Sequence, residues 1–254
     1  VCVRRKARPG KVAIVASGPS ATEFVELLKE FDGEIWGING AFQWLRHRGV
    51  EPSAFVGIDP EWFLVEYLNT PPDIYPPLNA TYYLGGQVHP TVFDHLQDRN
   101  VKLWFPADSQ VKLPFGAIPV YGGSTCLGRA PNLAYLLGWR EVHIFGGDSS
   151  YGRKSHVYGA DGEVPGGTFP VEMNGEIYLT TRQFLSQACE FVEQMVEWAR
   201  PGDNGDVALS VSLYGDGLTQ AMYAQTLESG GYHQYLREAY KDGFTRKQRK
   251  ALRA

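Results

Sequence analysis

Short apolar runs alternate with amphipathic stretches along most of the chain. The run "VAIV" enters the turn "SGPS", and the following "ATEFVELLKE" carries apolar residues at helical spacing. The same order returns further along, where strands are predicted at 34–38, 54–58 and 101–105 with helices in between. Strands that alternate with helices predict an α/β fold with a mostly parallel sheet and right-handed crossovers.

A later unit of the same kind begins with the corner "GGST". An apolar helix is predicted at 127–137, and a strand at 142–145 then enters "GGDSSY". A further amphipathic helix is predicted at 181–199, and a last strand lies within "DVALSVSLYGDG". The side chains that we expect the helix at 181–199 to bury in the core are Phe184, Leu185, Ala188 and Met195.

The pattern divides the chain into three segments. Residues 1–10 form a basic N-terminal segment, residues 11–222 the α/β domain, and residues 223–254 a helical, increasingly basic tail. Within the domain, residues 160–178 are rich in glycine and contain two prolines, which predicts a long loop or a short hairpin. The position of this region directly after the polar corners favours a lid.

Two corners made of small residues follow predicted strands and precede predicted helices. The carboxyl ends of parallel strands form the ligand crevice of an open α/β sheet, so we expect a shared site there. The first corner lacks the lysine of a P-loop and the spacing of a GxGxxG fingerprint, and we expect it to hold phosphate or ribose with backbone donors and a serine hydroxyl. The corners are Gly18-Pro19-Ser20, in which Ser20 is the expected helix N-cap, and Gly122-Gly123-Ser124-Thr125.

Three further polar residues lie where strands are predicted to end. Asn39 either adopts a left-handed backbone beside Gly40 or hydrogen-bonds a base or ribose. Asp59 either forms a turn before Pro60 or binds ribose hydroxyls or Mg²⁺. Asp148 follows two glycines that allow close backbone approach, which favours a catalytic role. If the reaction needs Mg²⁺, Asp59 and Asp148 are the expected ligands.

His156 is the histidine that we expect to act as a general base. It lies in the polar segment "GRKSHVYG", where an imidazole could deprotonate an acceptor hydroxyl near neutral pH; an exposed loop position is the alternative. The residues expected to contact the acceptor or a phosphate are Gln87, His89, Tyr151, Arg153 and Asp216.

Composition narrows the classes of partner. The 254 residues are 43% hydrophobic and 20% charged, as in ordinary globular proteins, and can bury a full core. A net charge of −4 gives no general attraction to nucleic acid or anionic membranes, although the basic ending "KDGFTRKQRKALRA" leaves a nucleic-acid partner open. No apolar run approaches the roughly 20 residues of a membrane span.

The cysteines and the N-terminal sequence bear on the compartment. The three cysteines are widely separated and lack CxxC spacing, which indicates neither a disulfide framework nor a zinc site. No apolar segment follows the basic residues at the start, as a secretory signal would require. We therefore expect a cytoplasmic protein.

The motifs taken together resemble a known family. "IVASGPSATEF", "INGAF", "PSAFVGIDP", "GGQVHPTVFDHL", "GGSTCLGRAPNLAYLLGWREVHIFGGDSSY", "SHVYG" and "YGDGL" occur in the order seen in the MptE-like family, over roughly residues 11–222. The family is named for an archaeal 6-hydroxymethyl-dihydropterin diphosphokinase and is similar to Maf flagellin glycosyltransferases and, more distantly, to bacterial sialyltransferases that use CMP-sugars. The resemblance implies a Rossmann-like sheet with flanking helices, followed here by a helical C-terminal extension.

The resemblance also implies roles for individual residues. In sialyltransferase-like members the corresponding corner, asparagine and serine hold the nucleotide, which carries over to Gly18-Pro19-Ser20, Asn39 and Ser124; their catalytic histidine follows a Gly-x-Asp corner, about where His156 lies. The archaeal diphosphokinases have a denser acidic motif in place of "VGIDP" and a His-Gly-Asp-Asn motif that this chain lacks.

Three functions follow as hypotheses. The first is a nucleotide-dependent transferase, a glycosyltransferase that takes a nucleotide sugar as co-substrate and a small molecule or glycan as acceptor. The second is a diphosphokinase that transfers pyrophosphate from ATP to a pterin-like alcohol with Mg²⁺. The third is a non-catalytic nucleotide-binding module. The sequence does not determine the oligomeric state.

Overall fold

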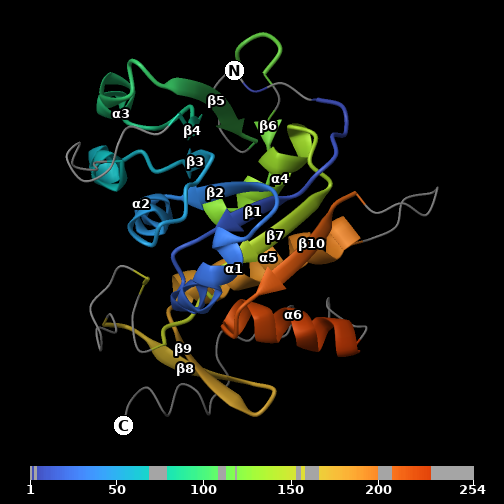
Figure 1. Ribbon diagram of the computed structural model, residues 1–254. Coiled ribbons are helices and arrows are strands. Elements are labelled where there is room, and N and C mark those ends of the chain that lie inside the picture. The colour runs from blue at the N-terminus through green and yellow to red at the C-terminus, as the bar shows by residue number, and fades with distance from the viewer. Residues whose placement is uncertain are drawn as a thin grey trace.

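A sheet of eight parallel strands forms the centre of the computed structural model (Figure 1), in the order β10-β7-β1-β2-β3-β4-β5-β6. The structure describes residues 2, 5–68, 79–107, 113–117, 119–152, 156–157, 166–199 and 208–229. The strands are β1 (Val12–Val15), β2 (Glu34–Ile38), β3 (Ala54–Gly57), β4 (Thr81–Gly85), β5 (Asn100–Pro106), β6 (Pro119–Val120), β7 (Glu141–Phe145) and β10 (Ser210–Tyr214). The predicted α/β class with a mostly parallel sheet is therefore confirmed.

The central strands are buried on both faces. All four residues of β1 have no exposed surface, and β3 is buried along its length. Continuous apolar runs of this kind are typical of parallel strands that helices cover from both sides. The central strands therefore stand in the sequence as short, continuous apolar runs.

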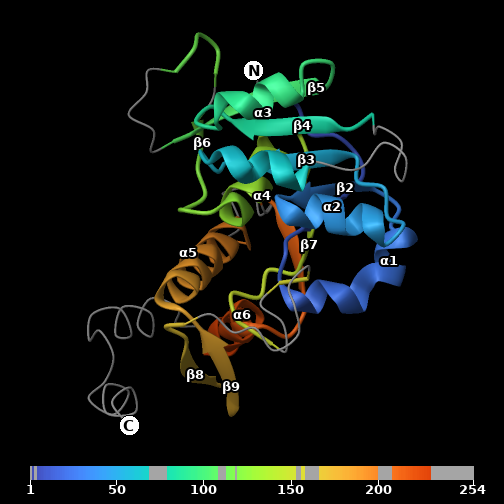
Figure 2. The same cartoon turned by 90° about the vertical axis from the view of Figure 1, so that its left-hand side faces the viewer.

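Helices cover each face of the sheet (Figures 1 and 2). On one face, Ile14 of β1 and Ile144 of β7 share a core cluster with α4 (Cys126–Leu136) and α5 (Arg182–Ala199). On the other face, Ala13 and Val15 pack with the 3₁₀ helix η1 (Pro19–Phe24), α1 (Val25–Lys29) and α2 (Gly40–His47). A third cluster joins β3 and β4 to η2 (Trp62–Tyr67) and α3 (Pro90–His95).

The direction in which strands are added reverses at β1. From β1 the chain builds β2 to β6 toward one edge, and α4 then carries it back so that β7 pairs with β1 on the other side. In open α/β sheets, ligands bind outside the carboxyl ends of the strands at this reversal. The topology therefore predicts a ligand site at the carboxyl ends of β1 and β7.

Most of the segment 166–180 is an antiparallel hairpin. Residues 158–165 lie outside the described part. Strands β8 (Phe169–Met173) and β9 (Glu176–Thr180) are joined by Asn174 and Gly175, whose φ angles of 54° and 82° suit a two-residue hairpin turn. The hairpin alternative is thus correct for the described residues 166–178 of this region, and movement as a lid stays a prediction. Both views show the hairpin beside α6 (Leu218–Ser229), with which it shares a core cluster.

The expected C-terminal extension is described only in part. Helix α6 continues the domain to Ser229, and the basic stretch from 230 onward lies outside the described residues. Among the helices that the structure describes, none has both the length and the apolar character needed to cross a membrane.

Candidate functional site

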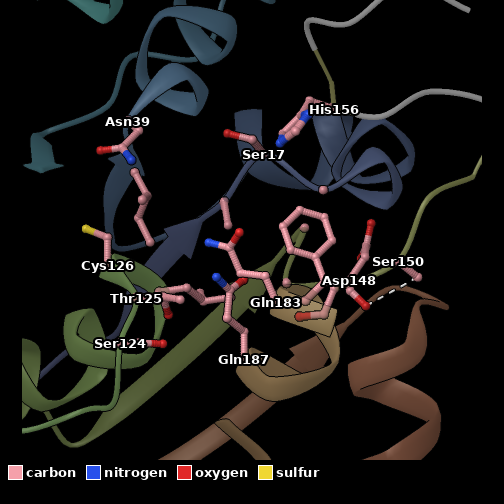
Figure 3. Close-up of a pocket in the computed structure, with 18 of the residues that line it drawn as sticks. Ser17, Asn39, Ser124, Thr125, Cys126, Asp148, Ser150, His156, Gln183 and Gln187 are labelled. Carbon is pink, nitrogen blue, oxygen red and sulfur yellow. Dashed lines mark hydrogen bonds between the residues drawn. The ribbon is translucent and has the colours of Figure 1, made fainter. Parts of the chain in front are cut away.

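A cavity of about 310 Å³ lies at the carboxyl ends of the central strands, where the strand order reverses (Figure 3). The loops after β1, β2, β3 and β7 line it together with the first turn of α4 and one face of α5. Among the residues proposed from the sequence, those that line the cavity are Gly18, Asn39, Asp59, Ser124, Thr125, Asp148 and His156.

Other proposed residues are not part of the cavity wall. The His89 ring instead accepts a hydrogen bond from the Thr91 amide at the start of α3, with a donor–acceptor distance of 3.3 Å. This contact makes His89 the N-cap of α3. Arg153 lies outside the described residues. The remaining proposed residues that do not line the cavity are Pro19, Ser20, Gln87, Gly122, Gly123, Tyr151 and Asp216.

The first corner is bound to a buried carboxylate of the protein. The Ser20 amide donates to Asp148 Oδ2 (2.9 Å) and its hydroxyl donates to Asp148 Oδ1 (2.5 Å). The prediction that Ser20 is a helix N-cap is therefore wrong: Gly18 is the N-cap of η1, and the serine hydroxyl is directed to Asp148. Burial raises the pKa of Asp148, and the hydrogen bonds from Ser20 oppose that rise.

The second corner begins α4, with the N-cap at Thr125. Its hydroxyl accepts a hydrogen bond from the Gly128 amide (3.0 Å), as an N-cap side chain should. The amides of Cys126 and Leu127 are in the first turn, where the helix itself supplies no acceptor. Both residues line the cavity, so the start of α4 presents backbone donors and the positive end of the helix dipole there.

Asn39 and Asp59 form a polar pair at the ends of β2 and β3. The Asn39 amide nitrogen donates to Asp59 Oδ2 (3.0 Å), while Asn39 Oδ1 is buried and has no hydrogen-bond partner among the described residues. The Asn39 backbone has φ 47° and ψ −128°, a conformation that L-residues adopt at a cost. Burial raises the pKa of Asp59, and the bond from Asn39 lowers it.

His156 lies across the cavity from Ser124 and Thr125 (Figure 3). The next residue, Val157, donates its amide to the Ser17 carbonyl (3.0 Å), which ties this segment to the end of β1. Burial lowers the pKa of His156 below its ordinary value of 6.5. The imidazole is therefore neutral at pH 7 and able to accept a proton.

Helix α5 contributes residues that the sequence analysis did not single out. Gln183, Phe184 and Gln187 line the cavity. The prediction that Phe184 is a core residue is wrong in this respect: its ring stacks on Tyr151 at 5.1 Å between centroids and meets the His156 ring edge-on at 6.4 Å. Polar residues spaced by four on a helix are the signal that could have identified Gln183 and Gln187.

The charges of the cavity wall limit which anionic ligands it can bind without a counter-ion. Its described lining contains two aspartates and His156 but neither lysine nor arginine. In the described residues, no group of three or more histidine, cysteine, aspartate or glutamate side chains is placed to hold a metal ion. Asp59 could therefore supply only part of the coordination of a Mg²⁺ ion that arrives with a nucleotide.

Comparison with known proteins identifies the family. Residues 3–154 match the family model described as 6-hydroxymethylpterin diphosphokinase MptE-like. The chain belongs to the MptE-like family. This MptE-like protein is also similar to the solved structure of a Maf glycosyltransferase from Magnetospirillum magneticum AMB-1, with a TM-score of 0.65 and 17% sequence identity.

That structural likeness establishes the fold of the MptE-like chain. It covers 92% of this chain but 40% of the Maf glycosyltransferase, so the chain spans less than half the length of that protein. No curated protein matches the chain. The description of the family indicates a group transferase, and the reaction must be argued from the cavity.

Proposed function

We propose that this MptE-like protein transfers a glycosyl group from a nucleotide sugar to an acceptor hydroxyl. The observation that carries the proposal is the placement of His156 across one cavity from the start of α4. A neutral imidazole can accept the hydroxyl proton, and a helix N-terminus can hold the phosphate of the leaving nucleotide. The two groups thus supply the base and the leaving-group site that such a transfer needs.

The remaining polar groups suit a nucleoside. Asn39 Oδ1 is buried and has no partner in the described part of the chain, so it can accept a hydrogen bond from a ribose hydroxyl or from an amino group of a base. Asp59 is held beside it by the Asn39 amide and can accept a second hydroxyl. We place the nucleoside at Asn39 and Asp59 and the phosphate at the amides of Cys126 and Leu127.

The proposed step is a single displacement. The acceptor oxygen forms a bond to the anomeric carbon while the bond from that carbon to the phosphate oxygen breaks. The acceptor proton passes to the His156 imidazole, and the electron pair of the broken bond leaves with the nucleotide phosphate. The charge on that phosphate is stabilised by the dipole of α4.

The diphosphokinase is the second candidate, and the presence of Asp59 in the cavity favours it. Pyrophosphate transfer from ATP would place several negative charges beside a described lining with two aspartates and no lysine or arginine. That reaction therefore needs Mg²⁺ with the nucleotide. A dependence of binding on Mg²⁺ distinguishes it from the glycosyl transfer proposed above.

A thermal-shift panel tests the proposal. Ligands that bind only the folded state stabilise it by about 2.7 kcal/mol at 100 times their dissociation constant. We expect a nucleotide sugar, and the nucleotide that it releases, to raise the melting temperature without Mg²⁺. Stabilisation by ATP only with Mg²⁺ would favour the diphosphokinase, and stabilisation without turnover of any donor would favour a binding module.

A further inference from the structure

In the second corner, the two hydrogen-bond donors of Ser124 are already bound to a side chain of the protein. The Ser124 amide and the Ser124 hydroxyl both donate to one oxygen of Glu190, Oε2, at 2.9 and 2.8 Å. Glu190 belongs to α5 and lies 66 positions further along the chain. A carboxylate that accepts two converging donors from a glycine-rich corner makes the contacts that a phosphate oxygen would make there.

The corner is shaped to admit this group. Gly123 has a φ of +70°, and a Cβ built on it would lie 2.6 Å from Glu190 Oε2. Any larger residue would therefore push the carboxylate away from Ser124. The glycine leaves room for an anion directly against the backbone, and Glu190 fills that room.

The same corner faces the cavity. Ser124 and Thr125 belong to the cavity wall, as does Gln187, which precedes Glu190 on α5 by about one helical turn. A phosphate bound at the start of α4 would lie close to the Glu190 carboxylate. Two anions cannot share one pair of donors, and the described cavity wall has neither lysine nor arginine to offset their repulsion.

We propose that Glu190 is a specificity-determining residue that competes with the ligand for the phosphate position. The inference rests on the proposed function, because it extends the phosphate position proposed at the amides of Cys126 and Leu127 to the adjoining donors of Ser124. A nucleotide must displace the carboxylate from Ser124 to bind fully, whereas a nucleoside need not. Glu190 therefore lowers the affinity for phosphate groups and sets how strongly the protein prefers a nucleotide to the matching nucleoside.

A merely structural role for Glu190 makes a different prediction. As a clamp, the carboxylate would hold the corner against α5 and stabilise the start of α4 through its dipole. Replacement by glutamine keeps an acceptor oxygen for both Ser124 donors and removes the charge. Replacement by alanine removes both. A clamp predicts unchanged binding for Glu190→Gln and weaker binding for Glu190→Ala, while a competitor predicts tighter binding for both.

The experiment measures dissociation constants by calorimetry for inorganic pyrophosphate, a panel of nucleoside monophosphates and the matching nucleosides. We expect Glu190→Gln to bind the phosphate-bearing ligands about twofold to fivefold more tightly than the wild type, in the range of one charge at a helix N-terminus. Nucleoside affinity should not change. Glu193→Gln, on the exposed side of the same helix, removes an equal charge and should leave every affinity unchanged.

Several results would overturn the inference. These are phosphate affinities for Glu190→Gln no higher than in the wild type, an equal gain for nucleosides, or an equal gain for Glu193→Gln. If a nucleotide binds the wild type and Glu190→Gln shows no gain, the proposed function stands and the inference fails. If pyrophosphate binding responds to Glu190→Gln but no nucleotide binds, the proposed function fails. Absence of all phosphate binding overturns both.

Discussion

Ser20 and Asp148 lie 128 positions apart in the chain and are joined by two hydrogen bonds, from the serine amide and the serine hydroxyl to the two carboxylate oxygens. Gln220 of α6 adds a third bond, to Asp148 Oδ1 at 3.3 Å. One buried carboxylate therefore connects the loops after β1 and β7 to the first turn of α6. It organises the wall of the cavity, whichever reaction the cavity performs.

Loss of the serine hydroxyl should destabilise the protein in a pH-dependent way. We expect Ser20→Ala to lower the free energy of unfolding by ~1–3 kcal/mol at neutral pH, because Asp148 keeps its burial and loses a donor. The hydroxyl lowers the pKa of Asp148, so its removal raises that pKa further above the value in the unfolded chain. The folded state of the variant then binds more protons, and its stability falls more steeply as pH rises toward neutrality.

Urea unfolding at about pH 4 and about pH 7 measures this effect. The difference between wild type and Ser20→Ala should be larger at the higher pH. Ser210→Ala, at the exposed first residue of β10, serves as the control and should show no such trend. A difference that is the same at both pH values would contradict the assignment of the hydroxyl to an ionised Asp148.

A side chain at Gly18 should disrupt the same connection. The Gly18 backbone has ordinary angles, φ −64° and ψ 146°, so any cost of Gly18→Ala comes from contacts. A Cβ there would collide with the Gly146 carbonyl and lie 2.6 Å from Asp148 Oδ2. We expect a loss of ~1–3 kcal/mol in the free energy of unfolding. Gly166→Ala, where a Cβ meets nothing within 4 Å, is the control; equal losses in both variants would refute the steric argument.

Asn39 should tolerate glycine better than alanine. Both substitutions remove the bond to Asp59, but only alanine keeps a Cβ at φ 47° and ψ −128°. We expect the free energy of unfolding of Asn39→Gly to exceed that of Asn39→Ala by about 1 kcal/mol. The order should reverse at Asn100 in β5, where glycine weakens an ordinary strand. The same order at both positions would show that the Asn39 backbone is not strained.

The strands and helices of the fold could be predicted because local apolar runs in the sequence mark them. The strand predicted at 34–38 matches β2, and the helix predicted at 127–137 differs from α4 by one residue at each end. A buried parallel strand leaves a short continuous apolar run in the sequence, and an apolar helix leaves a longer one. The corners between them were recognisable from their glycines and serines for the same local reason.

The partners of the corner residues could not be predicted in this way. Ser20 was expected to cap a helix, because no local pattern indicates a carboxylate 128 positions away. Glu190 lies on a helix whose period shows which residues are polar, but not which loop they meet. Phe184 has the spacing of a core residue and lies where the helix passes the cavity. Such contacts depend on tertiary packing, which the period of a single element does not contain.

His156 provides the sharpest test of the chemistry. If it is the base, His156→Ala should lower kcat by a factor on the order of 10²–10⁴ and leave the nucleotide Kd nearly unchanged. Burial lowers the pKa of the imidazole, so kcat/KM of the wild type should fall only as pH drops through a midpoint below 6.5. The variant should lose this limb of the pH profile. His95→Ala, on the exposed side of α3, should keep both rate and profile. Melting curves must first show that each variant is folded; a folded His156→Ala protein with unchanged turnover would exclude His156 as the base.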